Sequence, residues 1–371
     1  MIVYLSIPML MVFLWLVNIF FKIKKDTILR IGMIYLFVIS SFRSTSLGAD
    51  SFNYIKAFKI IGNSGTYYME KGYVFLNRLV SMFTSNYTVL ILIVNSIFFL
   101  SLSYYIKKFV DKNYWIYCLM FISLQPYIFL QTTFNIIRQC CAVSFVIIAM
   151  CFLVNSIRFK HKFTGYIMFN IMTIIGAQFH RSAYLFLAIP IIFLIKMNKN
   201  RWRFLAFVFI GFNFITFSRM ISRVELLAGY TNYSNYGASI LNNPAYIILV
   251  LLYLFWITSY YDNLELDKWE QNFYDLYLFS IVFLLFAVSN DMVYRVYIIM
   301  AIISLPAIQV IFKNDKSSKI VLSHRLNFKR VRVFSFALCS YYFFFFIGYI
   351  FYLYINHNSI YIPYHTIFWK G

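Results

Sequence analysis

Charged side chains are scarce in this sequence: Asp, Glu, Lys and Arg make up 12% of its 371 residues, and only 12 residues are acidic. Soluble domains carry about 25% charged residues and about 45–50% apolar ones, whereas 62% of this chain is hydrophobic. This composition leaves no room for a soluble domain. Apolar runs recur from one end to the other, and each is long enough to cross a hydrocarbon core of about 30 Å. The chain is predicted to be an all-α polytopic membrane protein.

Several familiar functional signatures are also missing. The sequence has no glycine-rich nucleotide-binding loop, no Ser-His-Asp signature and no internal repeat. Its five cysteines all fall within predicted spans, so neither a disulfide framework nor a metal site is expected. The first apolar run, 2–21, lacks basic residues before it and a cleavage site after it. It is therefore expected to be a retained span rather than a signal peptide.

About twelve transmembrane helices are predicted, in one integral membrane domain covering residues 1–371. Cytoplasmic loops carry more Lys and Arg than outside loops, and alternate loops here hold two thirds of the 33 basic residues. Assigning those loops to the cytoplasm places both termini outside, together with two long periplasmic loops at about 43–86 and 220–243. The net charge of +21 then reflects topology and lipid headgroups, and nucleic-acid binding is not expected. The predicted spans are 2–21, 28–42, 87–106, 114–130, 134–156, 164–180, 182–197, 202–219, 244–261, 272–289, 292–312 and 333–355.

Arginine predominates among the basic residues predicted to lie outside, whereas lysine predominates inside. Lysine suffices for orientation, but the planar guanidinium of arginine matches phosphate or carboxylate with two parallel hydrogen bonds. The outside set therefore indicates an anionic ligand, although snorkelling and ordinary ion pairs account for some of its members. Its arginines are Arg43, Arg78, Arg138, Arg181, Arg219, Arg223 and Arg295.

The first outside loop is the longest early polar interruption of the sequence. It holds two carboxylates, Asp50 and Glu70, among basic and tyrosine side chains that include Tyr54 and Tyr73. Gly48, just before Asp50, permits a turn from loop to helix. Residues 72–83 span only about 18 Å as a helix, which is too short to cross a membrane, so an interfacial or re-entrant helix is predicted there.

Four further groups of polar residues lie beside predicted spans or in the second outside loop. Charged residues in such places are functional candidates by default, but each group also has an ordinary structural explanation. Arg138 can snorkel at a helix start, His180 can be a structural interfacial histidine, and Asp291 and Arg295 can form a plain helical ion pair. Tyrosines in the second loop suit a sugar platform as well as a flexible loop. The groups are Arg138-Gln139, His180-Arg181, Asp291 with Arg295, and Arg219, Arg223, Tyr230, Tyr233 and Tyr236.

A set of short motifs follows in order along nearly the full chain. The motifs are Arg43 with Gly48-Ala49-Asp50 and Tyr54, Glu70-Lys71-Gly72-Tyr73, Arg138-Gln139-x-x-Ala142, His180-Arg181-Ser182 and Ile362-Pro363-Tyr364. With these motifs the chain resembles the EpsG-like branch of the Wzy-type O-antigen and capsular polysaccharide polymerases. It departs from that pattern after Glu70, where Lys-Gly replaces the more usual Pro-Gly.

The resemblance implies a glycosyltransferase of the bacterial inner membrane with a GT-C-like helical bundle. Such an enzyme transfers a glycan from undecaprenyl diphosphate to a new lipid-linked repeat unit on the periplasmic face, without a metal, nucleotide sugar or other cofactor. The donor and acceptor lipids, membrane lipids, a flippase and a chain-length regulator are its implied partners. Asp50, Glu70 and His180 are the candidate catalytic residues, and substrate contacts fall to Arg43, Tyr54, Tyr73, Arg138, Gln139, Arg181 and Arg295. Arg219, Arg223, Tyr233 and Tyr236 are assigned to the glycan.

The chemistry of the residues agrees with that activity but leaves alternatives. A departing diphosphate gains negative charge that preorganised guanidinium groups stabilise, and the acceptor hydroxyl needs one base. Asp50 is placed slightly ahead of Glu70 as that base, with His180 third. A flippase for lipid-linked glycans is the alternative from another class, and an O-antigen ligase or a membrane acyltransferase is a third. Sugar identity, linkage and stereochemistry do not follow from the sequence.

Overall fold

In the computed structural model, every regular element of the described residues is a helix, and one isolated antiparallel bridge pairs Arg43 with Thr366. The described residues are all except 1, 22, 160–161, 196, 216–243, 260, 262–265, 288–290, 318–342, 356–363, 365 and 367–371. The chain divides into two compact units, Met1–Leu187 with Lys319–Gly371, and Ala188–Ser318. The predicted helical membrane protein is confirmed at this level, whereas the single domain stays a prediction.

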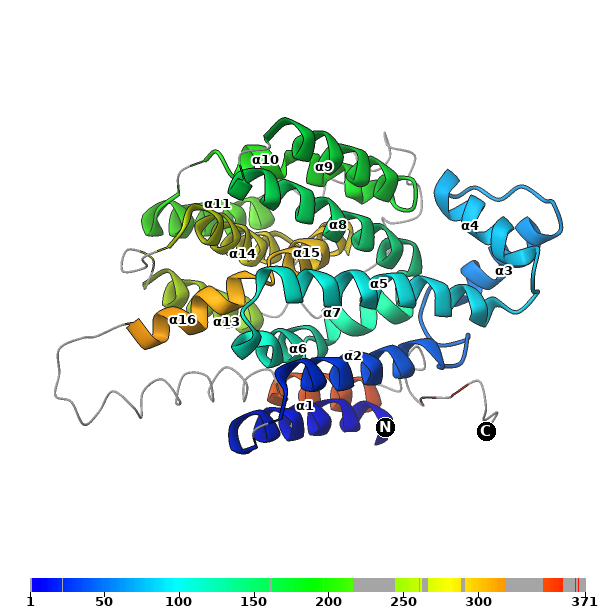
Figure 1. Ribbon diagram of the computed structural model, residues 1–371, viewed down its shortest axis with the longest axis horizontal. Helices are drawn as coiled ribbons and strands as arrows, with labels where there is room; N and C mark the ends of the chain where they lie inside the picture. The colour runs from blue at the N-terminus through cyan, green and yellow to red at the C-terminus, as the bar shows by residue number, and fades with distance from the viewer. Residues whose placement is uncertain are drawn as a thin grey trace. The chain divides into compact units, whose positions relative to one another are not determined.

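The first unit contains the motifs of the first outside loop and of the segments around Arg138 and His180. Figure 1 shows its last described helix, Phe343–Ile355, in red and its other helices in blue, cyan and green. They are α1 (Ile2–Phe20), α2 (Lys25–Ser41), α3 (Ser51–Gly62), α4 (Lys71–Ser81), α5 (Tyr87–Phe109), α6 (Trp115–Ser123), α7 (Pro126–Leu130), a π-helical turn (Gln131–Asn135), α8 (Ile137–Phe159), α9 (Lys162–Ala177) and a 3-10 helix (Arg181–Ala188), with a 3-10 turn at Lys112–Tyr114.

Helices α2, α5 and α8 form a packed layer tied by buried polar side chains. Asn95 of α5 donates to Ser41 Oγ of α2 at 3.2 Å and accepts a weak bond from Cys140 Sγ of α8 at 3.9 Å. Such interhelical bonds hold helices together where lipid provides no hydrophobic driving force. At the other end of α2 and α5, Asp26 pairs with Lys107. The two contacts show that α2 and α5 run antiparallel.

The segment after α2 docks on the π-helical turn that precedes α8. Arg43 is 1% exposed and donates to the backbone carbonyls of Leu47 at 2.6 Å and Phe134 at 2.8 Å. Its guanidinium also lies over the Phe134 ring, 5.0 Å from the centroid. Gly48 has a φ of 110°, and a β-carbon there would lie 2.3 Å from the Phe134 carbonyl oxygen. The expected loop-to-helix turn is therefore present, and it requires glycine for two independent reasons.

Tyr364, the described residue of the carboxyl-terminal motif, lies near the same turn. Tyr364 donates to the Ile39 carbonyl at 2.8 Å, near the end of α2, and its ring meets the Tyr4 ring edge-on at 5.5 Å. Asn135 of the π-helical turn accepts from the Asp50 backbone N–H at 2.9 Å. The π-helical turn thus fixes the start of α3, and Tyr364 holds the end of α2 that precedes it.

Helices α3 and α4 pack against each other near the amino-terminal end of α5 (Figure 1). α4 is the helix predicted at 72–83, and its length is as expected. One face is buried through Tyr73, Asn77 and Val80. On the other side α4 exposes the apolar Phe75 and Leu79, and the turn that follows it exposes Met82 and Phe83. An amphipathic helix of this kind suits the interface of a membrane, and that location stays a prediction.

The second unit contains α10 (Ile189–Ile192), α11 (Lys199–Ile215), α13 (Pro244–Ser259), α14 (Lys268–Ala287), α15 (Asp291–Ile303) and α16 (Ala307–Ser317). A buried carboxylate, Asp275 of α14, ties its helices together. It accepts from Trp202 of α11 at 3.2 Å and from the Tyr261 hydroxyl at 2.7 Å. Since buried acids are costly without partners, these donors and Gln271 explain how α14 tolerates Asp275.

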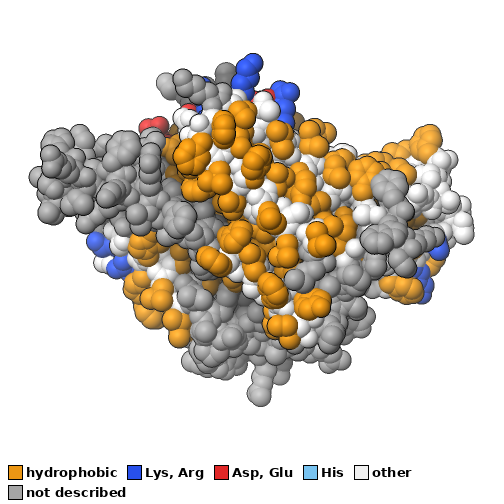
Figure 2. Space-filling view, turned by 90° about the horizontal axis from the view of Figure 1, so that it is seen from below, with side chains coloured by type: hydrophobic (Ala, Val, Ile, Leu, Met, Phe, Trp, Pro, Cys, Tyr) orange, Lys and Arg blue, Asp and Glu red, His pale blue; other side chains and the backbone are white. Residues whose placement is uncertain are grey.

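Three helices among the described residues have the length and hydropathy to cross a membrane: Ile2–Phe20, Tyr87–Phe109 and Ile137–Ile157. Figure 2, viewed from the side on which Figure 1 draws α1, shows a face where hydrophobic side chains predominate and Lys and Arg lie at the margins. Along α1, the exposed side chains include Met9, Phe13, Leu16 and Phe20, spaced as one helical stripe. Such a surface suits lipid better than water. The total of twelve spans stays a prediction.

Three predicted spans are not single helices: 114–130 divides into α6 and α7, 292–312 divides into α15 and α16, and 182–197 departs furthest. Residues 182–197 were expected to form a single membrane-spanning helix, but Arg181–Ala188 is a 3-10 helix that gives way to only four α-helical residues at Ile189–Ile192. Pro190 lies at the start of that short helix, where its missing N–H is tolerated, but in a longer helix it would remove an internal hydrogen bond. Apolar composition alone does not distinguish these cases.

The antiparallel packing makes the predicted topology testable within the first unit. Ser64, between α3 and α4, and Lys112, just beyond α5, are both exposed and lie beyond opposite ends of α5. In a variant without native cysteines, Ser64→Cys should react with an impermeant maleimide in intact cells, whereas Lys112→Cys should react only after the cells are opened. The reverse pattern of labelling would invert the topology.

Candidate active site

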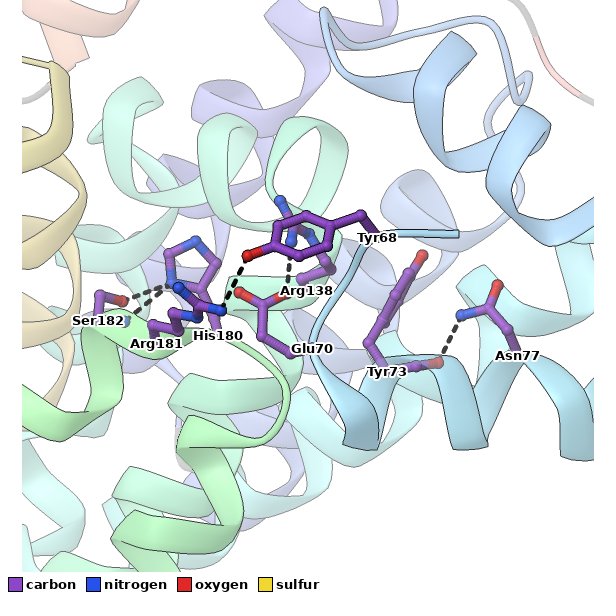
Figure 3. Close-up of polar contacts among 8 residues, drawn as sticks. All are labelled: Tyr68, Glu70, Tyr73, Asn77, Arg138, His180, Arg181 and Ser182. Carbon is purple, nitrogen blue, oxygen red and sulfur yellow. Dashed lines mark hydrogen bonds and ion pairs between the residues drawn. The ribbon is translucent and has the colours of Figure 1, made fainter. Parts of the chain in front are cut away.

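The centre of the candidate site is an ion pair between Glu70 and Arg138 (Figure 3). Glu70 is the residue before α4 and has an extended backbone, and Arg138 is the second residue of α8. Their side chains are 10% and 19% exposed. The pair joins two segments that are 68 residues apart in the sequence. It is thus shielded from water on most sides but still reachable from solvent.

Two tyrosine rings pack against the Arg138 side of this pair. The Arg138 guanidinium lies over the Tyr54 ring, 5.6 Å from its centroid, and the Tyr54 and Tyr73 rings meet edge to face at 5.9 Å. In a cation–π contact of this kind, the positive guanidinium is attracted to the negative face of the aromatic ring. Burial raises the pKa of the Tyr73 hydroxyl well above its usual value. Tyr73 therefore stays protonated at neutral pH and can donate a hydrogen bond but cannot act as a base.

The start of α4 docks directly on the segment that carries His180. The Gly72 backbone N–H donates to the Gln178 carbonyl at 2.8 Å, which satisfies one of the unpaired donors of a helix amino terminus. A β-carbon on Gly72 would lie 2.8 Å from that same oxygen. Only glycine allows this approach. The Glu70-Lys71-Gly72-Tyr73 motif is explained by two contacts, Glu70 to Arg138 and Gly72 to Gln178.

His180 is buried, and its ring is oriented by Ser182. The Ser182 backbone N–H donates to His180 Nδ1 at 3.3 Å, and Ser182 Oγ lies 2.7 Å from the same nitrogen. Because Nδ1 accepts the backbone bond, the neutral ring carries its proton on Nε2. In that tautomer Nε2 is a donor, so His180 is better suited to orient an oxygen than to remove a proton from one.

Arg181, unlike its neighbour, is exposed. Its Nη2 donates to the Tyr68 hydroxyl at 3.4 Å, which brings the 3-10 helix at Arg181–Ala188 next to the chain just before Glu70. Figure 3 shows Tyr68, Glu70, Arg138, His180 and Arg181 converging on one place. Two guanidinium groups and one carboxylate therefore lie together at one end of the first unit.

The structure does not bring every predicted residue into this cluster. Arg43 contacts carbonyls of the loop and of the π-helical turn, as described above. Asp50 is the residue before α3, where its backbone N–H donates to Asn135 and its side chain makes no capping bond. Gln139 is completely buried on α8. Arg295 lies on α15 of the second unit, and its predicted substrate contact stays a prediction. The glycan assignments, Arg219, Arg223, Tyr233 and Tyr236, lie outside the described residues.

Sequence reasoning missed the π-helical turn and the role of Tyr68. The polar run Gln131-Thr132-Thr133-Phe134-Asn135 separates two apolar stretches, and it was a usable signal for an interrupted helix. π-Helical turns are rare and frequent at functional sites. For Tyr68, the only indication in the sequence of a place at the site was its position two residues before Glu70. No group of three or more His, Cys, Asp or Glu within the described ranges could hold a metal ion.

Comparison with known proteins identifies one family. The model of the EpsG family matches residues 26–366, which covers every motif described above. Comparisons with curated proteins and with solved structures gave no match.

Proposed function

The chain belongs to the EpsG family, whose members are membrane proteins of polysaccharide biosynthesis, and from this premise we propose that it is a polysaccharide polymerase. Its substrates are two lipid-linked glycans on undecaprenyl diphosphate, one the donor and one the acceptor, at the outer face of the bacterial inner membrane. The product is an O-antigen, a capsule or another exopolysaccharide. The observation that carries this proposal is the cluster of Glu70, Arg138 and Arg181, which brings a shielded carboxylate and two guanidinium groups together.

The proposed reaction is a direct glycosyl transfer. An acceptor hydroxyl attacks the anomeric carbon of the donor sugar, and the bond from that carbon to the diphosphate oxygen breaks. The electron pair of that bond leaves with the diphosphate, and the acceptor proton passes to a carboxylate. Arg181, exposed at the edge of the cluster, can stabilise the developing charge on the diphosphate. No nucleotide is required because the donor sugar is already activated.

We place Glu70 first as the base, ahead of Asp50, which reverses the order suggested by the sequence. One oxygen of Glu70 is bound by Arg138, so the carboxylate has a defined orientation, and Figure 3 shows its other oxygen on the side of Tyr68 and Arg181. General bases work when they are held within reach of the proton. Asp50 instead heads a helix whose start is fixed by Gly48 and Asn135. We assign His180 to orienting the substrate, consistent with its tautomer.

The position of the cluster favours a polymerase over a flippase. A flippase needs charges in a central cavity that opens to both sides of the membrane. In the first unit, Glu70, Arg138 and Arg181 lie at one end of the helices, and Lys107 with Asp26 lies at the opposite end of α5. A site confined to one end suits chemistry on one face.

The test uses purified protein in detergent, without a membrane to cross. Purified lipid-linked repeat units of the source strain are added, and the products are separated by size. A ladder of polymers with two or more repeat units is expected. If no ladder forms while the same protein in vesicles moves labelled repeat units across the bilayer, the polymerase proposal is wrong and the protein is a flippase. Transfer only after addition of an outer-core lipid acceptor would identify a ligase.

A further inference from the structure

Two exposed tyrosines lie in the two segments that meet beside the Glu70–Arg138 pair, and the proposed reaction leaves them without a role. Tyr68 is 85% exposed and Tyr184 is 45% exposed. They come from separate segments: Tyr68 from the chain before α4, and Tyr184 from the 3-10 helix at Arg181–Ala188. The contact between Gly72 and Gln178 holds these segments together. The tyrosines therefore belong to one local structure, although 116 positions separate them in the sequence.

Both hydroxyls are held by donors from the His180 segment. Gln178 Nε2 donates to the Tyr184 hydroxyl at 3.2 Å, and Arg181 Nη2 donates to the Tyr68 hydroxyl at 3.4 Å. Gln178 thus contacts α4 through its backbone and Tyr184 through its side chain. An interfacial tyrosine that only anchors a protein in lipid needs no such partners. Here the polar ends are tied at the site, whereas much of the surface of each side chain faces solvent.

Exposed aromatic rings beside amide and guanidinium donors match the chemistry of a sugar. One face of a pyranose presents C–H groups with partial positive charge, which pack on the negative face of an aromatic ring. The hydroxyls around its rim accept from donors such as Gln178 and Arg181. Anionic ligands need the donors but not the rings, and acyl chains need the rings but not the donors. Of these three ligand classes, a carbohydrate uses both.

We propose that Tyr68 and Tyr184, with Gln178 and Arg181, form the platform that binds the acceptor sugar of the new lipid-linked repeat unit. This inference rests on the proposed function and identifies where one of its substrates lies. The acceptor is the partner whose proton must reach Glu70, and Tyr68 precedes Glu70 by two residues. The long bond between Arg181 and Tyr68 is at the surface, so an arriving hydroxyl can replace it at little cost.

The experiment uses the full-length protein in detergent and two readouts. The first is binding of oligosaccharides released from the strain's own polysaccharide by mild acid, measured by saturation-transfer NMR. The second is polymerisation of purified lipid-linked repeat units. The variants are Tyr68→Ala and Tyr184→Ala, the ring-preserving Tyr68→Phe and Tyr184→Phe, and Tyr67→Ala as the matched neighbour outside the platform. Gel filtration checks that each variant is folded.

Each alanine variant should bind the oligosaccharides about tenfold more weakly, because stacking on an aromatic ring is lost. The phenylalanine variants should lose about threefold or less, and Tyr67→Ala should bind like the wild type. Unchanged binding in both alanine variants would overturn the platform, even if polymerisation fell. Wild-type protein that polymerises but does not bind the oligosaccharides would also overturn it and leave the proposed function standing. If wild-type protein binds them through these tyrosines but makes no polymer, the polymerase proposal fails and the platform survives.

Discussion

Glu70→Gln should abolish polymer formation, with a fall in turnover of about two to four orders of magnitude. Glutamine keeps the size and shape of the side chain but cannot take the proton of the acceptor hydroxyl. The same change removes the negative partner of Arg138, whose side chain is only 19% exposed. An unpaired charge at that depth should cost about 2 kcal/mol of folding stability. Activity is measured by in vitro polymerisation, and stability by thermal unfolding.

A double substitution separates these two effects. Glu70→Gln combined with Arg138→Gln leaves no unpaired charge, so it should recover most of the lost stability. It should stay inactive, because the base is still missing. Recovery of polymer synthesis in the double variant would show that the pair is only structural. Arg138→Lys is the matched control for geometry: it keeps the charge but loses the planar fork that orients the carboxylate, and a partial loss of turnover is expected.

Asp50→Asn tests the order of the two acids directly. With Glu70 as the base, this variant should retain measurable turnover at normal protein levels, because the backbone contacts that fix the start of α3 do not involve its carboxylate. An inactive Asp50→Asn beside an active Glu70→Gln would return the role to Asp50. His180→Gln should weaken substrate binding more than turnover.

Arg43→Lys should reduce the amount of folded protein rather than the activity of the molecules that fold. The guanidinium reaches the Leu47 and Phe134 carbonyls together while it lies over the Phe134 ring. A lysine ammonium is a point charge without this fork, so at least one buried carbonyl should lose its donor. A cost of about 2–4 kcal/mol is expected. Thermal unfolding and turnover per folded molecule are the two measurements.

Two other variants calibrate this result. Gly48→Ala disrupts the same contact between the segment after α2 and the π-helical turn, because its β-carbon would lie 2.3 Å from the Phe134 carbonyl oxygen. It should be at least as destabilising as Arg43→Lys. Arg78→Lys makes the same chemical change at an exposed site on α4 and should have little effect. A stable Arg43→Lys protein with lost turnover would favour the diphosphate contact predicted from the sequence over the anchoring role.

The contrast between Arg43 and Arg181 shows how far sequence reasoning could reach. Both are arginines of the predicted outside surface, and both belong to motifs of the family, so the sequence assigned them the same ligand. Their difference depends on burial and on partners that are distant in the sequence. Phe134 is 91 residues from Arg43, and Tyr68 is 113 residues from Arg181. No local pattern encodes such partners.

The sequence by itself determined the helical membrane class, the family, the short helix α4 and the turn at Gly48. The class, the helix and the turn follow from composition, periodicity or local backbone preference, which act over a few residues, and the family follows from motifs in order along nearly the full chain. The tertiary structure alone decided that Glu70 meets Arg138, that Gly72 docks on Gln178, and that Arg43 is an internal anchor. These outcomes depend on close packing between α4, α8 and the segment before the 3-10 helix, where one missing β-carbon or one buried carbonyl decides which side chains meet.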